Sequence, residues 1–182
     1  MVNTFRLWSA AATDEFDLYE LKSGSYRDSV AAKNEAENIT MVLYPNAETE
    51  NGRQLRLRQQ YFLASASLQD IIADWTRQNG NDFDQFADKY CFQLNDTHPA
   101  IAVPELMRLL MDEHGFGWDE AWKVSTSTMA YTNHSLLPEA LETWPVALFK
   151  TMLTRVLEII YVINVRFLAE VSRHLPGDLE TL

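Results

Sequence analysis

The sequence predicts a helix-rich α/β fold with a few parallel strands, packed as a single unit over residues 1–182. Two short apolar runs, at residues 90–94 and 129–131, each end in a cluster of polar side chains, and helical patterns lie between them. A strand, then helices, then a second strand is the order that a parallel pair requires. With 182 residues, of which 47% are hydrophobic, the chain is long and apolar enough to form a core.

Before the first polar cluster, the apolar pattern changes from strand-like to helical. The segment at 26–39 carries only small apolar residues, so this helix is expected to be exposed or to contact another subunit. The segment at 55–75 keeps a helical period that Gly80 ends. The elements expected here are a strand at 4–10, an acidic loop at 13–24, and helices at 26–39 and 55–75.

Further helical segments follow the first polar cluster. Pro104 begins one of them, and Trp118 begins another with Asp119 well placed in its first turn. Residues 144–175 form a long amphipathic pattern, which as one helix would measure about 45 Å at 1.5 Å per residue. A break near Thr154 is therefore expected.

The composition argues against several kinds of partner. The formal net charge of −11 repels polyanions, so neither nucleic acid nor an anionic membrane is an expected partner. The single cysteine, Cys91, cannot form an internal disulfide and is expected to be a buried thiol. No apolar segment has the length of a signal-peptide core or the roughly 18 residues of a membrane helix. A cytoplasmic location is therefore expected.

Polar side chains follow both apolar runs at the point where each run ends. They are, in order, Asn95, Asp96, Thr97 and His98, and then Thr132, Asn133, His134 and Ser135. The carboxyl ends of parallel strands share one edge of a sheet, and ligands of open α/β sheets bind there. Both clusters are therefore expected to face one pocket.

Asp96, His98 and His134 allow more than one interpretation. As metal ligands they have suitable chemistry for zinc or iron, but no further cysteine or histidine has ligand spacing, so no metal is expected. As a catalytic triad they lack a nucleophile on a glycine-flanked turn. As partners of sugar hydroxyls they offer donors and acceptors in fixed directions. A structural role, in which Asp96 and His98 only turn the chain into the next helix, stays open.

Longer motifs occur in order along the chain. They are VLYPN at 42–46, RLRQQYF at 56–62, LQDII at 68–72, QLNDTHP at 93–99, VPELMR at 103–108, AYTNHSLLPEALETWP at 130–145 and LEIIYVIN at 157–164. Together they resemble the α-1,4-glucan phosphorylases, the family of the glycogen, starch and maltodextrin phosphorylases. The resemblance extends over almost the whole chain.

The resemblance implies an internal fragment of the amino-terminal, glucan-binding, Rossmann-like domain of a two-domain glycosyltransferase fold, without the cofactor domain. Enzymes of this family transfer a terminal α-1,4-linked glucosyl unit to orthophosphate and release α-glucose 1-phosphate, with the phosphate of pyridoxal phosphate acting in proton transfer. An α-1,4-glucan and orthophosphate are therefore the expected partners of the parent enzyme. The isolated chain is expected to bind no pyridoxal phosphate and to be inactive.

The resemblance also implies roles for individual residues. His134 matches the family histidine that holds the glucosyl unit beside the cofactor, and Asp96 matches an aspartate of the same neighbourhood, so both are expected to be catalytic. Substrate-binding positions are expected at His98, Asn46, Arg56, Glu139 and Ala140. The helix at 26–39 matches a subunit contact of the family, which predicts a homodimer.

The sequence departs from the family pattern around the expected site. Ala47 and Glu48 replace the Asp-Asn pair that usually follows the asparagine of the loop covering the site. Ala73 and Asp74 stand where regulated animal members carry an arginine pair, so activation by AMP is not expected. Two other functions stay open, a stand-alone carbohydrate-binding module and an oligomerisation module.

Overall fold

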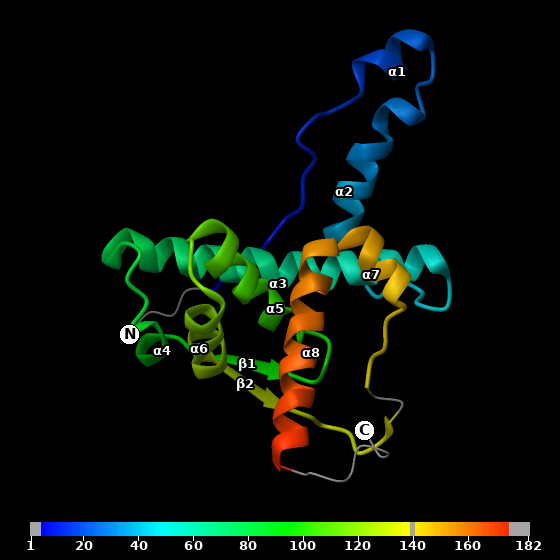
Figure 1. The fold of residues 1–182 in the computed structure, drawn as a ribbon. Helices are drawn as coiled ribbons and strands as arrows, with labels where there is room; N and C mark the ends of the chain where they lie inside the picture. The colour runs from blue at the N-terminus through cyan, green and yellow to red at the C-terminus, as the bar shows by residue number, and fades with distance from the viewer. Residues whose placement is uncertain (1–4, 139–140, 175–182) are drawn as a thin grey trace. The chain divides into compact units, whose positions relative to one another are not determined.

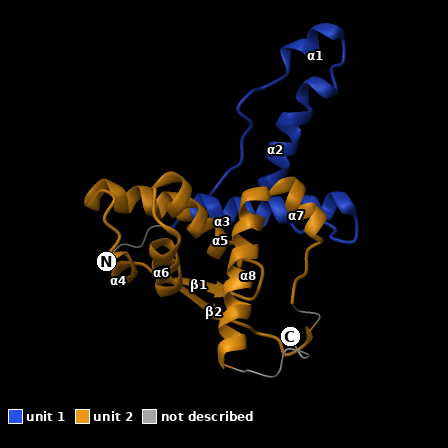
Figure 2. Cartoon of the chain, viewed as in Figure 1, with its two compact units in different colours: residues 1–67 blue, residues 68–182 orange. Residues whose placement is uncertain are grey.

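The structure of the chain, a computed structural model, describes residues 5–138 and 141–174 (Figure 1). The chain falls into two compact units, residues 1–67 and residues 68–182 (Figure 2). The long helix α3 (Glu50–Asn79) contributes residues to both units. A single folding unit over the whole chain stays a prediction.

The first unit contains short helices before α3. They are α1 (Leu18–Ser23), the 3-10 turn η1 (Asp28–Val30) and α2 (Ala31–Met41). The helix α1 lies inside the segment that was expected to be an acidic loop, so that expectation is wrong. Asp17 explains the difference, because its Oδ1 accepts hydrogen bonds from the N–H groups of Tyr19 at 2.8 Å and Glu20 at 3.2 Å and so caps the helix.

The strand expected at residues 4–10 is absent from the described part of that segment. Residues 5–10 have no regular secondary structure. Phe5 and Leu7 are 84% and 83% exposed, so their side chains are not buried against a sheet. A strand needs a neighbouring strand for its backbone hydrogen bonds, and an apolar alternation alone does not supply one.

The helix expected at residues 26–39 is present as η1 and α2, with Ser29 of η1 buried. No residue of α2 is buried. Polar contacts within the first unit hold the helix instead: Lys33 pairs with Glu15, and Arg58 Nη1 lies 3.0 Å from Glu35 Oε2. At its carboxyl end, Gln59 Nε2 donates to the backbone oxygen of Ile39 at 3.0 Å.

The second unit contains the expected parallel pair of strands. Strand β1 (Phe92–Asn95) pairs with β2 (Met129–Thr132), and Figure 1 shows the two arrows side by side and pointing the same way. The register places Asn95 opposite Thr132. Cys91 lies just before β1 and is exposed, so the expectation of a buried thiol is wrong.

The second unit also contains several helices besides α3. They are α4 (Phe86–Lys89), α5 (Ala102–Arg108), the π-helical turn η2 (Leu109–Glu113), α6 (Trp118–Thr128), α7 (Val146–Met152) and α8 (Thr154–His174). The break expected near Thr154 is confirmed, because Leu153 separates α7 from α8. Glu120 Oε2 accepts from the N–H of Gly117 at 3.2 Å and fixes the start of α6.

The core of the second unit is centred on α5, which packs against α6 and α8. Its buried apolar side chains include Leu68, Ile72, Trp75, Phe83, Phe86, Leu106, Met107, Leu109, Leu110, Ala121, Val156, Leu157 and Ile159. Trp75 meets Phe86 edge-on with the ring centroids 5.4 Å apart, and its Nε1 donates to the backbone oxygen of Asp82 at 2.7 Å. Both the apolar and the polar part of this indole are thus satisfied.

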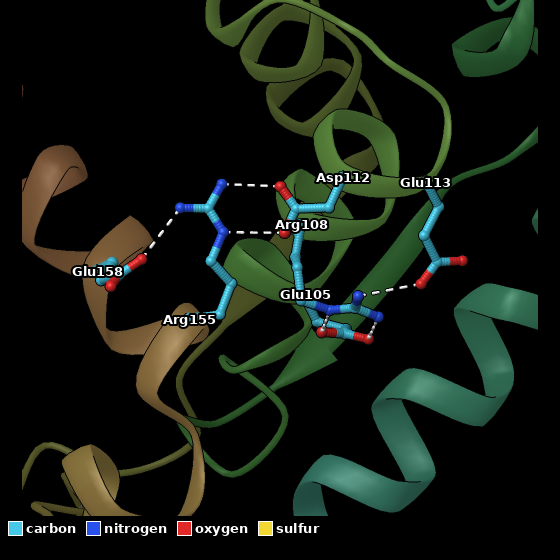
Figure 3. A network of polar contacts seen from close by, with 6 residues as sticks. All are labelled: Glu105, Arg108, Asp112, Glu113, Arg155 and Glu158. Carbon is cyan, nitrogen blue, oxygen red and sulfur yellow. Dashed lines mark hydrogen bonds and ion pairs between the residues drawn. The ribbon is translucent and has the colours of Figure 1, made fainter.

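Two arginines of this core pair with carboxylates, one within α5 and one between α8 and η2 (Figure 3). The guanidinium of Arg108 donates two hydrogen bonds, of 2.8 and 2.9 Å, to the fully buried carboxylate of Glu105. Arg155, at the start of α8, forms the same bidentate arrangement with Asp112 of η2, with hydrogen bonds of 2.8 and 2.7 Å. The hydrogen bond from the Arg155 guanidinium lowers the pKa of Asp112 below its usual value.

The Asp112 pair predicts a pH-dependent part of the stability. A carboxyl group with a lowered pKa in the folded chain stabilises the fold above its unfolded pKa of about 3.9, and this stabilisation is lost as the pH falls through the lower, folded value. We expect Asp112→Asn to lower the free energy of unfolding by about 1 kcal/mol or less at neutral pH. The difference from the wild-type chain should shrink in acid. Urea unfolding at a series of pH values measures both.

The matched control is Asp84→Asn, which makes the same change at an exposed aspartate of the same unit. It is expected to leave the free energy of unfolding within about 0.5 kcal/mol of the wild-type value. A deficit of Asp112→Asn that stays the same from neutral pH down into acid would contradict the assignment.

Candidate functional site

The polar clusters start at one edge of the parallel pair. Beyond the last pair of the register, the N–H of Asp96 donates to the backbone oxygen of Thr132 at 2.8 Å and extends the ladder by one bond. The side chains of Gln93 and Thr132 also meet across the strands, with Gln93 Nε2 donating to Thr132 Oγ1 at 2.8 Å. Both chain segments therefore leave the sheet from neighbouring positions.

Asp96 turns the chain at this edge and binds the second cluster. Its backbone has a φ of 59°, in the left-handed region where aspartate is one of the few residues that occur. In this conformation Asp96 Oδ1 accepts a hydrogen bond of 3.0 Å from the N–H of His134. The structure thus joins the two clusters directly, through the two residues that the sequence analysis singled out as catalytic.

The imidazole of His134 lies at the exposed edge of this arrangement. Its Nε2 is 3.4 Å from Oδ1 of Asn95, the last residue of β1. At that distance the contact is weak, and it requires the proton of a neutral imidazole to be on Nε2. A ligand arriving from solvent can therefore reach this ring.

His98 is held by a residue that sequence reasoning missed. Its Nδ1 lies 3.0 Å from Oε2 of Glu142, and the N–H of Glu142 donates to Oγ1 of Thr97 at 3.1 Å. The carboxylate of Glu142 is the less exposed partner, with 15% of its side chain accessible against 48% for His98. The chain beyond the second cluster is thus tied back to the end of β1.

Other polar groups of the second cluster form its own turns. Asn133 Oδ1 accepts from the N–H of Ser135 at 3.2 Å, and Ser135 Oγ accepts from the N–H of Leu137 at 3.2 Å. These contacts are local turns of the kind that asparagine and serine commonly make. Asn133 and Ser135 therefore shape the loop that carries His134.

The remaining predicted residues lie elsewhere. Glu139 and Ala140 fall outside the described residues. Asn46 and Arg56 belong to the first unit, and a place for them in the same site stays a prediction. The backbone turns tightly between Asn46 and Gly52. A Cβ on Gly52 would lie 1.8 Å from the backbone oxygen of Asn46, so only glycine permits this approach.

Imidazole, carboxylate, hydroxyl and amide groups make up the described part of the site. Among residues 5–138 and 141–174, no group of three or more histidine, cysteine, aspartate and glutamate side chains is arranged to hold a metal ion. Along the same residues, no helix combines the length and the apolar composition that crossing a bilayer requires. Imidazole, carboxylate and amide groups at fixed positions are well suited to the hydroxyl groups of a sugar.

Comparison with known proteins gives a consistent result. The family described as carbohydrate phosphorylase matches residues 1–182. The muscle forms of glycogen phosphorylase from Oryctolagus cuniculus and Homo sapiens are both 51% identical to the chain over 192 residues, covering 100% of the chain and 22% of each relative. The brain form from Bos taurus is 49% identical over 188 residues, with the same coverage.

The chain thus spans 22% of the length of these curated relatives. Each comparison covers the whole of the chain. Because the family match also extends over every residue, this chain belongs to the carbohydrate phosphorylase family.

Proposed function

We propose that the chain supplies the sugar-binding side of the active site of an α-glucan phosphorylase. The parent enzyme would transfer a terminal α-1,4-linked glucosyl unit to orthophosphate and release α-glucose 1-phosphate. Membership of the carbohydrate phosphorylase family supports this proposal. The observation that carries it is the hydrogen bond between Asp96 and His134 at the edge of the parallel strands, because it gathers sugar-binding chemistry at one point.

In this proposal each residue of the edge has a distinct task. His134 contacts the glucosyl unit, because its imidazole is exposed and its Nε2 lies 3.4 Å from Asn95 Oδ1 at the end of β1. Asp96 fixes the backbone of His134 and keeps its second carboxylate oxygen near the sugar. His98 contributes a further contact to a sugar hydroxyl, while Asn46, Arg56, Glu139 and Ala140 would line the approach to the bond that is cleaved.

Pyridoxal phosphate belongs to the proposed parent, where it supplies a phosphate group for proton transfer. The lysines of this chain do not fit its site. Lys22, Lys89, Lys123 and Lys150 are exposed. Lys33 is paired with Glu15, and this contact raises the pKa of its amine, whereas an imine-forming lysine must lose its proton. No step of the proposal is therefore assigned to the cofactor through residues of this chain.

The fold and the location complete the proposal. The parallel pair with its covering helices would be part of a Rossmann-like domain, to which both units belong as one folding unit. The parent would act in the cytoplasm on glycogen or on shorter maltodextrins. The absence of an arginine pair at Ala73 and Asp74 supports an enzyme without AMP activation.

Sugar binding tests this proposal directly. We expect the chain to bind a maltooligosaccharide in the millimolar range and His134→Ala to weaken binding roughly tenfold, the loss of about one hydrogen bond to the ligand. Isothermal titration calorimetry at high sugar concentration measures both affinities. The matched control is His174→Ala, at the exposed end of α8, which should leave the affinity unchanged. Equal affinities of the wild-type and His134→Ala chains would contradict the proposed site.

Turnover separates a part of an enzyme from a stand-alone carbohydrate-binding module. The chain alone, given glucan and orthophosphate, is expected to release no glucose 1-phosphate and to show no pyridoxal absorbance, because none of its described lysines fits the cofactor. Co-expression with the remainder of a phosphorylase should restore turnover, measured as glucose 1-phosphate. Turnover by the chain alone would refute the proposal, and binding without any restored turnover would favour the stand-alone module.

We propose a second function, subunit contact, for α2. No residue of this helix is buried in its own unit, although it carries apolar residues such as Ala32 and the 69%-exposed Met41. A face of this kind is typical of a helix that packs against another subunit. The chain would then form a homodimer through this helix.

The dimer predicts a clear effect of charge on α2. We expect the chain to sediment as a dimer and Ala32→Glu to sediment as a monomer, because a carboxylate buried in the contact would lose its hydration. Sedimentation velocity measures the mass of both. Ala47→Glu, the same change at an exposed residue outside α2, should stay dimeric. A wild-type chain that remains monomeric at all concentrations would remove the basis of this proposal.

A further inference from the structure

Glu142 makes two contacts with consecutive residues of the first polar cluster. Its carboxylate Oε2 lies 3.0 Å from His98 Nδ1, and its backbone N–H donates to Thr97 Oγ1 at 3.1 Å. The backbone contact fixes where Glu142 stands, and the carboxylate contact fixes which nitrogen of His98 faces it. These two contacts link positions 44 and 45 residues apart in the chain.

The chemistry of the contact decides the form of the imidazole. An ionised carboxylate only accepts hydrogen bonds, so the nitrogen facing it must carry a proton. In neutral histidine the hydrogen bond of one nitrogen determines which nitrogen is protonated. With Nδ1 protonated against Glu142, Nε2 of neutral His98 carries a lone pair and accepts hydrogen bonds.

We propose that Glu142 is a positioning residue of the sugar site, which holds the proton of neutral His98 on Nδ1 and so makes Nε2 an acceptor for a sugar hydroxyl. The sugar part of this statement rests on the function proposed above. Glu142 is suited to the task because only 15% of its side chain is exposed, so water competes less for its carboxylate than for the ring of His98, which is 48% exposed. An acceptor at this point would favour a ligand that presents a hydroxyl group and disfavour an analogue that lacks it.

The tautomer of His98 tests the inference without any sugar. Long-range ¹H–¹⁵N correlation spectra of the chain, recorded above the pH at which histidine titrates, show which ring nitrogen carries the proton. Loss of a signal in His98→Gln assigns His98 among the four histidines. We expect the proton on Nδ1 in the wild-type chain and a shift of the proton to Nε2 in Glu142→Ala. Glu142→Gln should keep it on Nδ1, because the amide oxygen can still accept.

His114 provides an internal control for folding of the same unit. Its Nδ1 lies 2.9 Å from Oδ1 of Asn81, and Asn81 Nδ2 donates to its backbone oxygen at 2.9 Å, so its signals report that neighbourhood rather than Glu142. They are expected to stay in place in every variant. Glu170→Ala, which changes an exposed glutamate on α8, should leave the tautomer of His98 unchanged.

Two results would overturn the inference. One is a wild-type His98 with its proton on Nε2, which needs no variant and therefore holds even if Glu142→Ala fails to fold. The other is a folded Glu142→Ala chain in which the proton stays on Nδ1. A chain that shows the expected tautomers but binds no maltooligosaccharide would sink the proposed function and leave the role of Glu142 toward His98 standing.

Discussion

The pairing of β1 with β2 is the constraint on which the candidate site depends. Its register places Asn95 opposite Thr132, and the added bond from Asp96 to Thr132 carries the pairing one step past the strands. In this register the Asp96 carboxylate accepts a hydrogen bond from the N–H of His134. A slip by one residue would also turn Leu94, a buried core residue, toward the other face, so core packing and site geometry select the same register.

A pair of strands of this length is not stable by itself in water, so packing against helices must stabilise it. Helix α5 follows the first polar cluster directly and packs against α6 and α8. The buried Glu105 is matched by Arg108 on the same helix, and leaving this carboxylate unpaired inside the core would be strongly destabilising. Arg155 then connects α8 to η2, the turn that follows α5. The last described helix is thus fixed to the core of the second unit.

Sequence reasoning succeeded where a periodic pattern is matched by burial. Apolar spacing and Gly80 predicted α3, and the order of strand, helices and strand predicted the parallel pair. The excessive length of the last helical pattern predicted the break near Thr154. Sequence reasoning failed at residues 5–10, where a strand would need a neighbouring strand, and at Cys91, which lies one residue before the start of β1. At the site it predicted the Asp96 and His134 neighbourhood from strand order, but no spacing rule connects Glu142 with His98 across 44 residues.

The exposure of the site has its own consequence for the proposed chemistry. A hydrogen bond formed in contact with water contributes only about 0.5–1.5 kcal/mol net, because water competes for both partners. His134 and His98 are exposed, so the contacts of this edge alone can give weak binding and little stabilisation of a charged transition state. Electrostatic catalysis needs donors and acceptors fixed in a site from which water is excluded. The proposed activity therefore requires a second wall over the edge of the strands, whereas the orientation of His134 by Asp96 and of His98 by Glu142 is already built into this chain.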